Sequence, residues 1–184
     1  GIYRTNDGSN EILKDLENVD YLILALPAQN IKGVLSDFNI SNKNQNIIIA
    51  SKGIDIDSVK FLSEVVYEST KSNNISILSG PCFSHEVAQN LPTAVTLATE
   101  NKTTFESIAK LFQDKNFRLY YSDDLIGCQL GGAIKNIYAI AVGITAGLNL
   151  GENAKSSLIT RSFAEMTRLG KELKIKKETL FGLS

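Results

Sequence analysis

The stretch Asn46-Ile47-Ile48-Ile49-Ala50-Ser51 is an unbroken apolar run that Lys52-Gly53 closes. A second run, Tyr21-Leu22-Ile23-Leu24-Ala25-Leu26, is closed by Pro27. Continuous apolar runs, as opposed to alternating ones, are typical of strands that are buried on both faces of a parallel sheet. The two stretches therefore predict two such strands.

Helical patterns alternate with further strand candidates along the first 121 residues. The weaker strand candidates are Ile75–Ser79, Ala94–Ala98 and Leu119–Tyr121. Apolar residues at helical spacing predict a helix over Ser58–Thr70, with Val59, Leu62, Val65 and Val66 on one stripe. A second helix is predicted over Thr104–Phe112, with Thr103 or Thr104 as N-cap. Glu11–Leu16 is a shorter candidate. This alternation favours a βαβ-type, doubly wound α/β domain.

The pattern changes at Ser122, after which no strand-like run occurs. Asp123 or Asp124 is placed to cap a long helix that runs to about Gly147. A second helix is expected from Glu152 or Asn153 to about Leu169, with Gly170 as its stop. We therefore predict a Rossmann-type parallel sheet over residues 1–121 and an all-α domain over 122–184. The chain starts without methionine and stops without a cap, so we expect both domains to be truncated.

Composition excludes several classes of protein. The chain is 43% hydrophobic and 21% charged, with a net charge of −1, which is ordinary for a soluble globular protein and leaves no electrostatic footprint for nucleic acid. A single histidine and two distant cysteines cannot build the usual zinc sites, so no metal is expected. Cys82 and Cys128 are most simply reduced thiols of a cytoplasmic protein.

Lys135 is the most informative charged residue, because it lies in the middle of the apolar segment Leu125–Gly147. A helix that is apolar all round is buried in a larger protein or in a membrane. Burial lowers the pKa of a lysine, which makes its amine usable as a general base. A membrane span is disfavoured by Lys135-Asn136 at its centre. A lysine that snorkels from a partly exposed face is the structural alternative.

The neighbours of Lys135 carry a resemblance to a known family. Gly131-Gly132-Ala133-Ile134-Lys135-Asn136 resembles the catalytic helix of NAD(P)-dependent glycerol-3-phosphate dehydrogenases. The resemblance continues through Gly147–Ala154, Leu158–Arg161 and Ala164–Gly170. It implies that Lys135 contacts the substrate and accepts its proton, and that the cofactor is NAD or NADP.

Two upstream segments extend the resemblance. Lys52 follows a predicted strand, and the family's lysine at this place contacts both substrate and cofactor. In Ser79-Gly80-Pro81-Cys82-Phe83-Ser84, the resemblance implies substrate binding by Gly80 and Cys82 and cofactor binding by Ser84. A turn of this kind that opens a short helix also exposes backbone N–H groups suited to an anion.

Cys82 and Ser84 depart from the family's pattern, which usually has serine or threonine at the first position and often alanine at the second. A thiol is a weak hydrogen-bonding group, so a backbone contact from Cys82 is better supported than a side-chain contact. A small, part-buried residue is the structural alternative for Cys82. His85 is interpreted as a solvated residue at a helix start and is assigned no chemistry.

The resemblance implies an oxidoreductase that interconverts sn-glycerol 3-phosphate and dihydroxyacetone phosphate and feeds glycerophospholipid synthesis. A homodimer is the protein partner considered. No Gly-x-Gly-x-x-Gly fingerprint occurs in the chain; the family carries it upstream of the position where this chain begins, so the preference for NAD or NADP is left open. We expect the 184 residues alone not to turn over substrate.

Two rival interpretations remain at this point. One is a 3-hydroxy-acid dehydrogenase of the same two-domain class, because that wider group loosely shares a Lys-Asn pair on a glycine-rich helix. The other is a non-catalytic module in which the long apolar helix serves for oligomerisation. A dinucleotide fingerprint in the full gene would favour the enzyme over the module.

Overall fold

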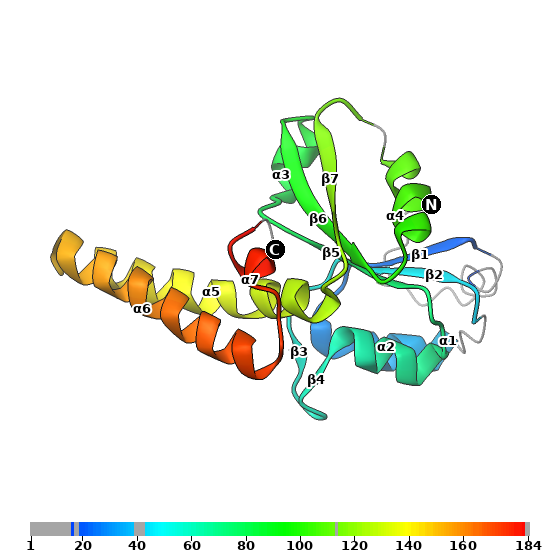
Figure 1. Ribbon diagram of the computed structural model, residues 1–184, viewed down its shortest axis with the longest axis horizontal. Helices are drawn as coiled ribbons and strands as arrows, with labels where there is room; N and C mark the ends of the chain where they lie inside the picture. Colours follow the sequence, from blue (N-terminus) through cyan, green and yellow to red (C-terminus); the bar gives the residue numbers. More distant parts are fainter. Residues whose placement is uncertain (1–15, 17–18, 39–42, 113, 183–184) are drawn as a thin grey trace. The chain divides into compact units, whose positions relative to one another are not determined.

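The computed structural model describes residues 16, 19–38, 43–112 and 114–182 (Figure 1). The chain divides into two compact units, Gly1–Ser76 and Ile77–Ser184. The division falls inside strand β5 (Ile75–Ser79). The predicted boundary near Tyr121 has a different basis, because it marks the place where strands give way to helices. That boundary stays a prediction, and the helix expected at Glu11–Leu16 lies, apart from Leu16, outside the described residues.

The first unit contains the two strands that the long apolar runs predict. Strand β1 (Tyr21–Leu24) pairs in parallel with β2 (Asn46–Ile49), with Leu22 opposite Ile47 and Leu24 opposite Ile49. In β2, Ile47, Ile48 and Ile49 are all fully buried, which confirms the expected burial on both faces. In β1 the expectation is wrong, since the Ile23 side chain is 50% exposed.

Helices α1 (Ile31–Phe38), which follows the 3-10 turn η2 (Ala28–Asn30), and α2 (Leu62–Thr70) lie side by side in this unit (Figure 1). The predicted helix over Ser58–Thr70 begins four residues too early. Strands β3 (Ile54–Asp55) and β4 (Lys60–Phe61) form an antiparallel hairpin there instead. The Asp55 carboxylate accepts hydrogen bonds from the backbone and hydroxyl of Ser58 and so holds the turn. Val59 is consequently 80% exposed with a φ of 55°, outside the apolar stripe.

The second unit contains a parallel pair, β6 (Thr93–Thr99) and β7 (Phe117–Ser122), in which Thr93 lies opposite Phe117. Helix α4 (Lys102–Leu111) connects the two strands. Its N-cap is Asn101, and the prediction of Thr103 or Thr104 is wrong. The Asn101 side-chain oxygen accepts the Thr103 backbone N–H at 2.9 Å. The strand order of the five-stranded sheet is β1-β2-β5-β6-β7, in agreement with the predicted α/β class.

After β7 the described chain is helical, with α5 (Leu125–Gly147), α6 (Gly151–Glu172) and α7 (Lys177–Leu180). Helices α5 and α6 run side by side as a long hairpin (Figure 1). The prediction that Gly170 ends α6 is wrong, because Gly170 lies buried inside the helix. A Cβ at Gly170 would come within 2.6 Å of the Leu180 Cδ1 atom, so this glycine allows α7 to pack closely.

Helix α5 is only partly buried, which corrects the expectation of an all-round buried helix. Its residues from Gly127 to Gly132 are buried. Further along, Ile137, Ile140 and Ile144 are 63%, 65% and 56% exposed. By length and composition α5 is the one helix in the described ranges that could cross a membrane, which is weak evidence because the core helix of a soluble protein passes the same test. The absence of a membrane span stays a prediction.

Asp124 joins the start of α5 to the start of α7. One carboxylate oxygen accepts the backbone N–H of Gly127 at 2.8 Å, as the predicted N-cap should. The other accepts the backbone N–H of Lys176 at 2.9 Å and the hydroxyl of Thr179 at 2.7 Å. Outside this cluster, the Lys176 amine pairs with the exposed Asp123 carboxylate, and its hydrogen bond lowers the pKa of Asp123.

Candidate active site

Ser51 joins the carboxyl ends of β1 and β2 in the first unit. Its hydroxyl accepts the Leu26 backbone N–H at 3.1 Å and lies within hydrogen-bonding distance of the Leu24 and Leu26 carbonyl oxygens, at 3.2 and 2.5 Å. Two residues later, Gly53 has a φ of 137°, and a Cβ there would lie 3.0 Å from the Ala28 Cβ. The two strand ends are therefore held together at the place where ligands of open parallel sheets collect.

Gln29 fixes the chain that follows this point. Its side-chain amide donates to the Ile54 carbonyl oxygen at 2.8 Å, and its side-chain oxygen accepts the Ile56 backbone N–H at 3.0 Å. The Gln29 side-chain amide thus pairs with backbone N–H and C=O groups as a neighbouring strand would. Lys52 lies between Ser51 and Gly53 on this anchored backbone, with its side chain exposed.

The end of β5 forms the second part of the site. Gly80 follows the strand, is buried, and has a φ of 152°, which residues with a Cβ rarely adopt. Helix α3 (Ser84–Ala88) follows the turn. Cys82 and Ser84 are both exposed, so the part-buried alternative for Cys82 is wrong. His85 is exposed as well, in agreement with its interpretation as a solvated residue.

Lys135 lies on α5 just after the buried Gly131-Gly132 pair and is half-buried. Its amine donates a hydrogen bond to the backbone carbonyl oxygen of Gly80 at 3.3 Å. The two residues are 55 positions apart in the sequence. The predicted proton acceptor and the predicted substrate-binding turn are therefore adjacent in the second unit.

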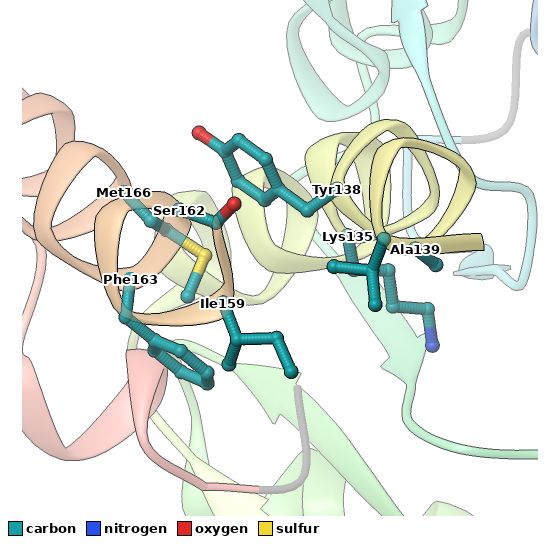
Figure 2. A pocket seen from close by; sticks show the side chains of 8 residues that line it. Lys135, Tyr138, Ala139, Ile159, Ser162, Phe163 and Met166 are labelled. Atoms are coloured by element: carbon teal, nitrogen blue, oxygen red, sulfur yellow. The ribbon is translucent and has the colours of Figure 1, made fainter. Parts of the chain in front are cut away.

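The stem of Lys135 also lines an open groove of about 390 Å³ between α5 and α6 (Figure 2). The α6 wall is formed by Ile159, Ser162, Phe163 and Met166. Figure 2 shows the Lys135 amine pointing away from Phe163 and Met166, so the apolar groove holds only the carbon stem. Tyr138 lines the same groove, and burial raises the pKa of its hydroxyl, with a further contribution from the Glu165 charge.

Ser79 immediately precedes the Gly80 turn and is a feature that sequence reasoning missed. Its hydroxyl is buried and has no hydrogen-bond partner among the described residues. A buried hydroxyl without a partner costs about 1–3 kcal/mol. No sequence signal could have singled it out, because a serine in a buried strand usually finds a partner.

The structure thus brings together Lys135 and Gly80, with Cys82 on the same turn and Ser84 at the start of α3. Lys52 belongs to the first unit. That Lys52 and Lys135 contact the same substrate, as the resemblance implies, stays a prediction.

An open parallel sheet followed by helices belongs to the class of α/β proteins that bind ligands at the carboxyl ends of the strands, where exposed Lys52 lies. The family model described as the N-terminus of NAD-dependent glycerol-3-phosphate dehydrogenase matches residues 7–105, and the model of its C-terminus matches residues 124–184. The chain belongs to the NAD-dependent glycerol-3-phosphate dehydrogenase family.

Individual relatives agree with this assignment. The chain is 43% identical over 171 residues to a glycerol-3-phosphate dehydrogenase [NAD(P)+] of Erythrobacter litoralis, covering 93% of this chain and 51% of that protein. It is 43% identical over 183 residues to the enzyme of that name from Zymomonas mobilis, covering 100% and 53%. The chain therefore spans about half the length of the curated relatives that it matches.

Solved structures place the fold in the same family. The crystal structure of a glycerol-3-phosphate dehydrogenase from Coxiella burnetii matches with a TM-score of 0.85 and 37% identity, over 94% of this chain and 53% of that one. The predicted fold class, a Rossmann-type sheet followed by a helical part, is confirmed.

Proposed function

We propose that this chain forms the catalytic centre of an NAD(P)-dependent oxidoreductase that interconverts sn-glycerol 3-phosphate and dihydroxyacetone phosphate. The observation that carries the proposal is the contact between the Lys135 amine and the Gly80 turn, found in a chain of this family. A place in the cytoplasm and in the supply of glycerophospholipid precursors belongs to the same proposal, as does a homodimer.

The first unit fits a dinucleotide at its strand ends. The φ of Gly53 and its close approach to Ala28 disfavour a side chain there, and exposed Lys52 supplies a positive charge beside it. A bare backbone and a cation at the carboxyl ends of parallel strands suit a pyrophosphate-bearing ligand. In this proposal Lys52 and Ser84 hold NAD or NADP, which supplies the hydride acceptor or donor.

The substrate is held, in the same proposal, by Lys52, Gly80, Cys82 and Lys135. In oxidation the neutral amine of Lys135 accepts the proton of the C2 hydroxyl while hydride leaves the same carbon. In reduction the ammonium returns a proton to the oxygen that develops negative charge. Cys82 contributes its backbone in this proposal, because its exposed thiol is the weaker hydrogen-bonding group.

The domain boundary near Tyr121 is also a proposal. It is supported by the two family models, which leave residues 106–123 between their matches.

Of the rival functions, a 3-hydroxy-acid dehydrogenase receives no support from the family match. Assaying the full-length protein with NADH or NADPH against dihydroxyacetone phosphate and against a 3-oxo acid tests the choice, and a preference for the 3-oxo acid would refute our proposal.

The two cysteines offer a direct test of the substrate turn. Cys82 is exposed, whereas burial raises the pKa of Cys128 to about 11. We expect iodoacetamide at pH 8 to label Cys82 and not Cys128 in the folded full-length protein, because the thiolate is the reactive form. Saturating glycerol 3-phosphate should slow labelling of Cys82, as measured by peptide mass spectrometry. Unchanged labelling of Cys82 under saturation would remove it from the substrate site.

Replacement of Lys52 by alanine tests the other half of the site. A hydrogen bond to a charged group contributes about 1.5–3 kcal/mol, so both the KM for dihydroxyacetone phosphate and the Kd for NADH should rise by about 10–100-fold. Lys32 on α1 is an exposed lysine of the same unit, and Lys32→Ala should leave both constants unchanged. Steady-state kinetics and fluorescence titration measure them. A rise in KM alone would limit Lys52 to the substrate.

A further inference from the structure

We propose that the backbone carbonyl of Gly80 is a positioning group that holds the amine of Lys135 in its reactive orientation. The inference rests on the proposed function and deepens it. The resemblance assigns Gly80 to the substrate, whereas the structure shows its carbonyl oxygen accepting a hydrogen bond from Lys135 at 3.3 Å. Gly80 would then act on the reaction through the lysine.

The direction of this carbonyl is set by the backbone on both sides of it. Before it, Ser79 is the last residue of strand β5, which fixes the peptide that leads into Gly80. After it, the ring of Pro81 disfavours the helical range of ψ at Gly80. Between them Gly80 takes a φ of 152°, which only glycine adopts without strain. A Cβ at this position would therefore force φ to change and swing the carbonyl away.

The length of the hydrogen bond makes it sensitive to such a swing. Typical N–H···O bonds are about 2.9–3.0 Å long, and the contact between Lys135 and Gly80 is already 3.3 Å. A small rotation of the carbonyl would take it beyond hydrogen-bonding distance. Gly80 is buried, so its position is fixed by the residues of the second unit that pack around it.

The chemistry of an amine explains why such an anchor matters. A neutral amine has one lone pair and two N–H groups on a long, flexible stem. Holding one N–H on a fixed acceptor limits rotation about the last carbon–nitrogen bond and directs the lone pair. Misplacement of a reacting group by about 1 Å can cost about 10²-fold in rate.

A double-mutant cycle in the full-length protein tests the proposal. We expect Gly80→Ala to lower kcat by about 10²-fold while the Kd for NADH stays within about 2-fold of the unmodified protein. In the Lys135→Ala background the same glycine change should alter the residual rate by less than about 3-fold, because the group on which it acts is gone. Rates of the slow variants are measured in single turnovers with enzyme in excess.

Several controls separate positioning from general damage. Gly33 lies in α1, and a Cβ there would meet no atom within 4 Å, so Gly33→Ala should leave kcat unchanged. If Gly80→Ala fails to fold, Pro81→Ala replaces it, because it relaxes the restriction on Gly80 and keeps the carbonyl. Its smaller cost should likewise vanish without Lys135.

Equal costs of the glycine change with and without Lys135 would overturn the proposal, since Gly80 would then act on substrate or fold independently of the lysine. Undiminished kcat in Gly80→Ala would overturn it too. Full activity of Lys135→Ala would instead refute the proposed function, so the two failures are distinguishable.

Discussion

Lys135→Ala in the full-length protein is expected to lower kcat for glycerol 3-phosphate oxidation by about 10²–10⁴-fold, the usual contribution of a general base. Dinucleotide affinity should stay nearly unchanged, because the Lys135 stem lies against α6 and its amine contacts the Gly80 turn of the second unit. Stopped-flow measurement of NADH formation and a fluorescence titration of NADH provide the two readouts.

Lys135→Arg should be nearly as damaging, since a guanidinium group keeps its proton at working pH. Lys155 on α6 forms an i,i+3 ion pair with Glu152 at 3.4 Å, and Lys155→Ala serves as the matched control with unchanged kcat. An arginine variant at position 135 that turned over at the rate of the unmodified enzyme would remove proton acceptance from this residue.

The second large effect concerns stability. Asp124→Ala is expected to lower the free energy of unfolding by about 2–4 kcal/mol, because it removes the N-cap of α5 and two further hydrogen bonds to a carboxylate. The donors of Gly127, Lys176 and Thr179 would lose their acceptor together. Urea denaturation of the full-length protein, followed by circular dichroism, measures the change.

Asp123 provides the matched control, because it is the adjacent aspartate and pairs only at the surface with the Lys176 amine. Asp123→Ala should cause a much smaller loss than Asp124→Ala, since an exposed ion pair is screened by solvent. Similar losses for the two variants would mean that the hydrogen bonds of Asp124 contribute little.

The sequence predicted the strands well where apolar runs were long, as in Ile47–Ile49, because a strand that is buried on both faces appears in the sequence as an unbroken apolar run. It placed the start of α2 wrongly because Val59 fits a helical stripe by type, whereas the Asp55–Ser58 turn directs it into solvent. The prediction that Gly170 ends a helix failed for a related reason. A glycine can end a helix or admit a neighbour, and only the packing of Leu180 decides between the two.

The candidate site could be predicted only through the family resemblance. Lysines and glycines after strands are common, and nothing in their local pattern distinguishes Lys52 or Gly80 from loop residues. The resemblance assigns Lys135 and Gly80 to the same substrate, and the structure places the two residues in contact. That the contact runs through a carbonyl oxygen, and that Gln29 braces the backbone around Lys52, depends on tertiary geometry which no single sequence displays.

The carboxylate of Asp124 also constrains the order in which this region is completed during synthesis. Two of its hydrogen-bond donors, on Lys176 and Thr179, lie 52 and 55 residues further along the chain. Helix α5 can coil as soon as its own residues leave the ribosome, since its internal bonds are local. The cap from Asp124 to Gly127 can form with it, whereas the other carboxylate oxygen gains its donors only after the whole α5–α6 hairpin and the start of α7 have emerged. In a nascent chain paused between the two helices, the N-terminal end of the apolar helix α5 would therefore be only partly stabilised.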